Sequence, residues 1–316
     1  MLVHAPTQEI RSWTTDSRRW SHYKPRPGDI VIATPAKCGT TWTQQIVSLL
    51  VFQTPEPRSL QSLSPWIDHR LAPIEEVVSD IEAQTHRRFL KAHLGVDQMP
   101  IYDEVRYIHV ARDGRDAFMS WHNHMSNYTA QSLARMDLMG EQDETIARPL
   151  PRAASDPRRF FQTWMTEGDG ARLADDMPAA RFFEIERSWW KERSRPNLLL
   201  VHYNDLKSDL DGEMRRIAAF LDVTVDEDMW PALVEAAGFE AVKRVGAALM
   251  PRAVMAWDKG ADRFFNEGTN ERWRDVLSAE DVARYEARAA QELSPGLARW
   301  LERGRLAAGD PRMAQD

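Results

Sequence analysis

The segment Thr34-Pro35-Ala36-Lys37-Cys38-Gly39-Thr40-Thr41-Trp42 carries the clearest chemical signal in the chain. It joins an apolar run to a stretch with helical periodicity and so predicts a strand–loop–helix turn. Such a turn directs free backbone N–H groups and the positive end of a helix dipole at one point, which creates an anion site. Lys37 adds a full charge, Gly39 allows close backbone approach, and Thr40 and Thr41 add hydroxyl donors. An ordinary turn without a ligand is the alternative interpretation.

This loop differs from the phosphate-binding loop of nucleotide triphosphatases. That loop reads Gly-x-x-x-x-Gly-Lys-Ser/Thr, with the lysine directly after the last glycine. Here Lys37 precedes Gly39 by two residues, and the first glycine is absent. The sequence therefore disfavours an ATP or GTP hydrolase, although the strand–loop–helix frame is shared. A P-loop small-molecule kinase stays open as an alternative.

A second candidate anion site lies in Val110-Ala111-Arg112-Asp113-Gly114-Arg115-Asp116. We expect Arg112 to project from the carboxyl end of a strand, where open α/β sheets bind ligands. Ser120 lies about two turns into the helix that should follow. Arginine offers paired donors to a phosphate, and a hydroxyl can complete the cradle. A salt-bridged helix start is the alternative interpretation.

Lys91 and His93 follow another predicted strand. Residues two apart on an extended chain point to the same side. A strand-end histidine is more often structural than catalytic, and His93 stands out because it shares a sheet edge with both candidate anion sites. His122 and His124 are two apart on a predicted helix and face different ways. We expect these two at the surface or in a lid, and the sequence shows no set of metal ligands.

The elements that must position these side chains alternate along the chain. Apolar runs at residues 29–34, 88–91, 105–111 and 197–203 predict strands, and amphipathic runs at 40–52, 113–124, 206–221 and 278–303 predict helices. This alternation predicts an α/β fold with a central parallel sheet flanked by helices. We expect a single domain over residues 1–316, with its core at about 28–275. Residues 125–155 have weak periodicity and contain Gly140, Pro149 and Pro151, so we expect a lid or acceptor-binding loop there.

The composition sets outer limits. The 316 residues carry a net charge of −7, with 43% hydrophobic and 28% charged residues, as in ordinary globular proteins. The acidic balance argues against a general nucleic-acid binder, and one cysteine excludes an intramolecular disulfide. No signal peptide is recognisable, and no run approaches the ~18 apolar residues of a membrane span. The sequence predicts a cytoplasmic protein without an integral membrane segment and leaves its oligomeric state open.

Together these residues resemble the sulfotransferases that use 3′-phosphoadenosine 5′-phosphosulfate (PAPS). The 34–42 segment is similar to their 5′-phosphosulfate loop, with Cys38 in place of the usual serine. Arg112 and Ser120 have the spacing of the family's 3′-phosphate motif. Lys91-Ala92-His93 is similar to the Lys-Thr-His that carries the catalytic base. The resemblance covers about residues 28–275, in order and with compatible spacing.

The resemblance implies roles for these residues. His93 would be the general base, Lys37 would stabilise the leaving phosphate, and Lys91 would add charge on the sulfuryl side, with no metal. Donor binding would involve a larger set: Lys37, Cys38, Gly39, Thr40, Thr41, Trp42, Arg112, Ser120, Tyr203, Phe239, Phe265 and Gly268. Within that set, Trp42, Tyr203 and Phe239 match residues beside the adenine.

The C-terminal donor loop departs from the family pattern. It usually reads Arg-Lys-Gly, whereas this chain has Asn266-Glu267-Gly268. A glutamate cannot contribute positive charge to a 3′-phosphate. We expect backbone N–H groups near Gly268, with Arg263 or Arg272, to compensate.

The acceptor implied by the resemblance is a hydroxyl of a small molecule or lipid. The stretch from Ser64 to His93 is especially similar to bacterial members, some associated with glycolipid acceptors. An apolar, adaptable lining suits such acceptors. Candidate pocket residues are Phe52, Trp66, Trp121, Met125, Tyr128, Met136 and Met139. A non-catalytic PAPS-binding protein is the alternative, which the intact Lys37, His93, Arg112 and Ser120 disfavour.

Cys38 carries a separate expectation. It follows Lys37 and precedes a helix N-terminus, and both features favour thiolate over thiol. We therefore expect a reactive thiol that gates the nucleotide site. An inert buried cysteine is the alternative.

Overall fold

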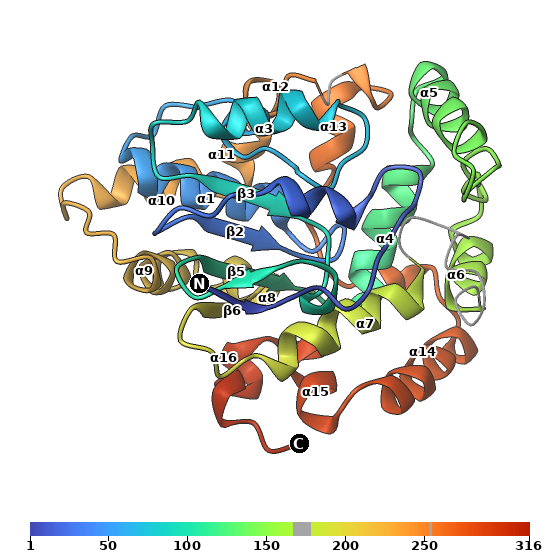
Figure 1. Cartoon of the computed structure of the whole chain (residues 1–316). Helices are drawn as coiled ribbons and strands as arrows, with labels where there is room; N and C mark the ends of the chain where they lie inside the picture. Colours follow the sequence, from blue (N-terminus) through green and yellow to red (C-terminus); the bar gives the residue numbers. More distant parts are fainter. Residues whose placement is uncertain (167–177, 253–254) are drawn as a thin grey trace.

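The structure, a computed structural model, describes residues 1–166, 178–252 and 255–316. A four-stranded parallel sheet has the order β3-β2-β5-β6. Its strands are β2 (Ile30–Ala33), β3 (Phe89–Ala92), β5 (Arg106–Ala111) and β6 (Leu198–His202). Figure 1 shows the sheet at the centre, with its carboxyl ends directed toward α4 (Gly114–Met125). The predicted α/β class and central parallel sheet are confirmed, and each strand lies within one residue of its expected bounds.

Both faces of this sheet are buried. Side chains of a strand alternate between its faces, so Ile30 and Ile32 of β2 enter one apolar core and Val31 and Ala33 the other. The first core is built with α1 (Thr40–Phe52), α8 (Tyr203–Ser208), α9 (Leu210–Phe220), α10 (Trp230–Ala237), α11 (Phe239–Arg244) and α12 (Gly246–Leu249). The second is built with α4, α3 (Ile74–Glu82), α6 (Pro157–Thr166), α7 (Ala179–Lys191), α14 (Ala279–Glu292) and α15 (Pro295–Arg303).

Shorter elements complete the fold. β1 (Leu2–His4) pairs antiparallel with β4 (Ile101–Tyr102). The remaining short helices are α2 (Leu60–Leu63), α13 (Gly260–Phe265) and α16 (Arg305–Ala308). Among the residues described, no helix has the length and apolar character needed to cross a membrane.

The two helices that follow the site strands begin where the sequence predicts. α1 has the predicted bounds, and α4 starts after Asp113, whose side chain accepts a hydrogen bond from the Arg115 N–H. An aspartate in this position satisfies one of the unpaired N–H groups of the first turn.

Two other predicted helices are each interrupted. The run at 206–221 forms α8 and α9, which meet at Asp209, whose carboxylate caps α9 through the Gly212 N–H. The run at 278–303 forms α14 and α15. Proline lacks the N–H that a continuing helix needs and is well suited to a first helical turn, so Pro295 ends one helix and begins the next. Ser294 caps α15 through the Leu297 N–H.

Residues 125–155 are not a continuous loop, because α5 (Ala130–Glu141) lies within them. Thr129 caps this helix through the Ser132 N–H. Gly140 reflects tight packing rather than a turn: a Cβ there would lie 2.3 Å from both Trp13 Nε1 and the Arg148 carbonyl oxygen. The helix buries little more than Met136 and Gly140, so its sequence shows only weak periodicity. A lid function for this segment stays a prediction.

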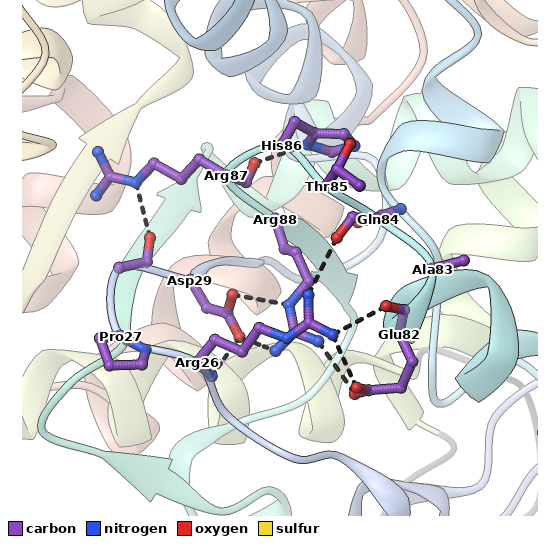
Figure 2. A pocket seen from close by; sticks show the side chains of 11 residues that line it. Arg26, Pro27, Asp29, Glu82, Ala83, Gln84, Thr85, His86, Arg87 and Arg88 are labelled. Carbon is purple, nitrogen blue, oxygen red and sulfur yellow. Dashed lines mark hydrogen bonds and ion pairs between the residues drawn. The ribbon is translucent and has the colours of Figure 1, made fainter.

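The amino ends of β2 and β3 are held by a buried ion pair. Arg88 donates to both carboxylate oxygens of Asp29, and their side chains are 1% and 3% exposed. The Tyr23 hydroxyl also donates to Asp29, at 2.6 Å. A hollow of about 500 Å³ surrounds this pair. Figure 2 shows that Arg26 and Arg88 both reach Glu82 there. Because these charges pair with one another, the hollow is a structural feature of the sheet's amino edge.

We expect Asp29→Asn to lower the free energy of unfolding by about 3–5 kcal/mol, because it removes the buried counter-ion of the Arg88 guanidinium and leaves only the partly exposed Glu82. Arg26→Ala is the matched control. It removes a half-exposed ion pair with Glu82 and hydrogen bonds to the carbonyl oxygens of Glu82 and Gln84 in the same hollow, and because these contacts are largely exposed we expect a smaller loss, of about 1 kcal/mol. Urea unfolding of both variants measures the difference, and equal losses would contradict the assignment.

Candidate functional site

A cavity of about 860 Å³ opens at the carboxyl edge of the sheet. The ends of β2, β3 and β5 and the middle of α4 bring Lys37, Lys91, His93, Arg112 and Ser120 to its wall. The cavity is also lined by other residues that the sequence singles out: Gly39, Thr40, Thr41, Trp42, Trp66, Trp121, Tyr128, Met136, Tyr203, Phe239 and Phe265. Three strand ends that are far apart in sequence thus form one site.

The loop between β2 and α1 adopts an unusual backbone. Lys37 and Gly39 have positive φ angles of 68° and 113°. At Gly39 a Cβ would lie 3.0 Å from the Tyr203 ring, so the close approach also favours glycine. α1 begins at Thr40 without a side-chain cap, which leaves N–H groups of its first turn available to an anion.

Lys37 and Lys91 are both partly buried in the wall of the cavity, and Lys37 lies near other cations. Burial is the main cause that lowers the pKa of Lys37 to about 7, and the charges of Lys91 and Arg112 lower it further. Burial likewise lowers the pKa of Lys91 to about 8, although Asp68 opposes the shift. Lys37 Nζ lies 4.6 Å from the centre of the Phe264 ring, and Lys91 Nζ lies 3.9 Å from that of Trp66. Aromatic faces therefore contribute to holding these ammonium groups.

The orientation of His93 identifies its free nitrogen. Its Nδ1 lies 2.8 Å from the carbonyl oxygen of Thr34, which can only accept, so Nδ1 carries the proton. Nε2 is then the unprotonated nitrogen. Burial, followed by the charge of Lys91, lowers the pKa of His93 well below 6.5. His93 is therefore neutral at physiological pH, with Nε2 available as a base.

Asp68 is a buried carboxylate behind this group. It accepts hydrogen bonds from Trp20 Nε1 at 3.0 Å, from Trp66 Nε1 at 2.6 Å and from the His93 N–H at 3.4 Å. It thereby fixes the Trp66 ring that underlies Lys91. The sequence gives Asp68 no role on its own, because its three donors come from separate parts of the chain.

Arg112 connects the loop that contains Lys37 with the segment that contains Thr269 and Asn270. Its guanidinium donates to the carbonyl oxygens of Lys37, at 3.4 Å, and Thr269, at 3.0 Å, and to Asn270 Oδ1 at 2.7 Å. It also lies 4.1 Å from the centre of the Tyr203 ring. Its Nε is buried and has no hydrogen-bond partner among the described residues. A buried donor without a partner is costly, and a bound anion would satisfy it.

Two lysines that the sequence analysis missed reach the loop around Gly268. Lys207 of α8 donates to the Gly268 carbonyl oxygen at 2.8 Å, and Lys243 of α11 donates to that of Asn266 at 2.5 Å. Arg272 contributes less positive charge to this loop than expected, because its Nε lies 3.2 Å from the Glu267 carboxylate. Positive charge near this loop thus comes from helices distant in sequence, which no local motif reveals.

The three predicted adenine-contacting rings lie together. Trp42 packs edge-to-face against Tyr203 and Phe239, with ring centres 5.3 and 6.0 Å apart. Gly268 has a φ of 63°, and a Cβ there would lie 2.2 Å from Phe239. Glycine is therefore required at this position for Phe239 to pack against the loop, which explains the one family residue retained in Asn266-Glu267-Gly268.

The expectation of a reactive Cys38 is wrong. Its side chain is completely buried and does not line the cavity. Burial is the main cause that raises its pKa well above 9.0, and the nearby charges of Arg112 and Lys37 do not offset it. Position before a helix favours thiolate only where the sulfur is partly exposed, and this thiol points into the apolar core.

The aromatic part of the cavity differs from the predicted pocket in a few positions. Phe52 packs against His86 at the far end of α1, with ring centres 5.0 Å apart. Met125 lies in the second core and lines a separate hollow, and Met139 does not line the cavity either. In their place the structure brings Trp257 and His124 into the wall. The expectation that His124 lies at the surface or in a lid is therefore wrong.

A family model of the sulfotransferase domain matches residues 27–295. The chain belongs to the PAPS-dependent sulfotransferase family. Because the chain belongs to this family, we conclude that the protein is an enzyme. This conclusion disfavours both alternatives, the P-loop kinase and the non-catalytic nucleotide-binding protein. Within residues 1–166, 178–252 and 255–316, no three or more His, Cys, Asp or Glu side chains cluster so that they could hold a metal ion.

Individual sulfotransferases match over almost the whole chain. A protein named glycolipid sulfotransferase from Mycobacterium tuberculosis is 34% identical over 319 residues, which cover 96% of this chain and 97% of the relative. Sulfotransferase 1B1 of Mus musculus is 25% identical over 296 residues, covering 90% and 89%. The fold is also that of retinol dehydratase, solved with androsterone and the inactive cofactor PAP. Its TM-score is 0.68 at 21% identity, covering 92% of this chain and 88% of that one.

We expect Lys37 of this sulfotransferase to react with acetic anhydride with a pH midpoint near 7, because only the neutral amine is nucleophilic and its pKa is about 7. An unperturbed lysine has a pKa of about 10.4, so a lysine model amide labelled in the same solution should show a rate that still rises above pH 9. Mass spectrometry after brief labelling from pH 6 to 10 gives both profiles. Coincident profiles for Lys37 and the model amide would contradict the lowered pKa of Lys37.

Proposed function

We propose that this sulfotransferase transfers the sulfuryl group of PAPS to a hydroxyl of a glycolipid. The carrying observation is the arrangement of one cavity. Partly or fully buried cations converge at the sheet edge, His93 has an unprotonated Nε2, and aromatic side chains line the same cavity. These are the parts needed to hold an anionic donor, accept a proton and place an amphipathic acceptor.

Donor binding would use charge from four elements. Lys37 and the first turn of α1 fit the 5′-phosphosulfate, and Arg112 with Ser120 fits the 3′-phosphate. The unpartnered Nε of Arg112 supports this assignment. Lys207, which donates to the adjacent Gly268 carbonyl oxygen, would supply the charge that Glu267 does not. Trp42, Tyr203 and Phe239 offer aromatic surface to the adenine.

The proposed reaction assigns one role to each of these side chains. The acceptor hydroxyl oxygen forms a bond to sulfur while its proton passes to His93 Nε2. The bond between sulfur and the bridging oxygen breaks, and that oxygen keeps the electron pair on the departing adenosine 3′,5′-bisphosphate (PAP). Lys37 stabilises the charge that develops on this oxygen, and Lys91 stabilises the sulfuryl oxygens. The bound anion also offsets the cationic field that lowers the basicity of His93.

The acceptor chamber supports an amphipathic substrate. Its walls carry Trp66, Trp121, Tyr128 and Trp257, and Met136, Met250 and Met255 lie nearby. Flat aromatic faces with interspersed polar groups suit a sugar headgroup, and methionines adapt to an irregular apolar chain. A relative that is 34% identical is named glycolipid sulfotransferase, which agrees with this acceptor class.

The test is transfer of ³⁵S from labelled PAPS to acceptors in mixed micelles. The panel contains a glycolipid, the same lipid without its sugar, the free sugar and a simple phenol. We expect labelled product from the intact glycolipid at much lower concentration than from either part, because only the glycolipid fills both the aromatic and the apolar parts of the chamber. Equal labelling of a simple phenol would contradict the glycolipid assignment and leave sulfuryl transfer intact.

We expect His93→Asn to reduce the rate by about 10²–10⁴-fold, the usual loss when a general base is removed. The asparagine amide can still donate to the Thr34 carbonyl oxygen, so binding of PAP should change little. Single-turnover kinetics and calorimetry measure the two quantities. The control is His122→Asn on α4, where the native ring contacts the Ala154 carbonyl oxygen away from the cavity. A rate above half that of the unmodified enzyme would eliminate this role for His93.

A further inference from the structure

His124 occupies a position in the cavity wall that the reaction scheme above does not use. It lies in the last turn of α4, four residues after Ser120. Its Nε2 is 2.8 Å from the Tyr128 hydroxyl, and its Nδ1 is 3.5 Å from Lys37 Nζ, at the long end of the hydrogen-bond range. The imidazole therefore lies between a tyrosine of the acceptor chamber and the lysine of the donor loop.

The surrounding rings fix this imidazole. It stacks on Trp121 with ring centres 5.3 Å apart and an interplanar angle of 18°, and the Trp257 ring centre lies 4.6 Å away. Trp257 Nε1 also donates to the His124 carbonyl oxygen at 3.0 Å. Because the ring is packed on two sides, its nitrogens have defined directions. Nδ1 faces Lys37, and Nε2 faces Tyr128.

The charges around Lys37 explain why an uncharged acceptor matters there. Lys91 and Arg112 both repel its ammonium group, and the Cys38 thiol exerts only a weak opposite effect. His93 faces the same space, and burial and the nearby lysines keep both histidines neutral. The lone pair of His124 Nδ1 can therefore stabilise the Lys37 ammonium without adding another positive charge.

We propose that His124 is a positioning residue for Lys37. The Lys37 ammonium can only donate, so Nδ1 of the neutral imidazole accepts from it, which keeps that lysine protonated and placed for the donor. The ring proton is then on Nε2, which donates to the Tyr128 oxygen. The proposal rests on the donor-binding role given to Lys37 above. It concerns the resting enzyme and involves no covalent step.

The consequence is a specific pH dependence. PAP binds best to protonated Lys37, so its affinity should fall as the pH rises through the pKa of Lys37 in the free enzyme, which is about 7. Removing the acceptor at residue 124 lowers this pKa and moves the fall in affinity to lower pH. Below pH 6, Lys37 is protonated with or without His124, so the affinities should converge there.

The test compares PAP affinity by calorimetry from pH 5.5 to 9 in the full-length enzyme and its variants. His124→Phe keeps an aromatic ring between Trp121 and Trp257 but removes both nitrogens. We expect about tenfold weaker binding at pH 7.5, the size of one lost hydrogen bond to a charged group, and near-equal binding at pH 5.5. His124→Asn places an amide oxygen near the Nδ1 position and should restore most of the affinity at pH 7.5.

Two further variants sharpen the result. Tyr128→Phe removes the hydroxyl that accepts from His124 Nε2–H and should shift the midpoint in the same direction, by less. His122→Phe changes the other histidine of α4, which lies outside this cavity, and should leave the profile unchanged. Weakening by the same factor at every pH would show a merely structural role and overturn the proposal. Failure of the unmodified enzyme to bind PAP would instead overturn the proposed function.

Discussion

The burial of several cations at one edge of a parallel sheet is the constraint on which this site depends. Lys37, Lys91 and Arg112 project into one cavity, and the two lysines have pKa values lowered to about 7 and 8. Such an arrangement is unfavourable in isolation, because burial and like charge both oppose ionisation. It persists because strand ends and a strained loop hold the groups in place. An anionic substrate would then supply the missing counter-charge.

Other parts of the fold stabilise these cations, mainly with uncharged groups such as aromatic rings and backbone carbonyl oxygens. Aromatic faces of Phe264 and Trp66 lie beneath the two ammonium groups. Backbone carbonyl oxygens of Lys37 and Thr269 accept from Arg112, so the guanidinium ties the donor loop to the chain around Gly268. Asp68 is buried behind these groups, and its charge acts to raise the pKa of Lys91. It also accepts a hydrogen bond from Trp66, which orients that ring. The site therefore keeps its positive potential while each cation is still held in place.

One cavity combines two kinds of lining. Lys37, Lys91 and Arg112 supply positive charge, and tryptophans and methionines supply apolar surface. His93 and His124 line the same cavity, and both are neutral because burial and the lysines suppress their charged forms. The two histidines thus have similar surroundings but different contacts. His93 keeps a free Nε2, whereas the nitrogens of His124 face Lys37 and Tyr128.

The sequence by itself determined the local features of this protein. Periodicity located the four strands to within one residue, and the types and spacing of Lys37, Lys91, His93, Arg112 and Ser120 identified the sheet-edge site and its family. These signals are local, because strand alternation, helix caps and loop chemistry depend on neighbouring residues.

Only the tertiary structure decided which distant side chains complete the site. Lys207, Lys243, Asp68 and Trp257 reach it from separate elements, so no motif contains them together. It also decided that Cys38 points into the core and that His124 faces Lys37. A residue's spacing along the chain does not determine its burial. Burial and the identity of charged neighbours set the pKa of each group, and both are properties of the packed fold.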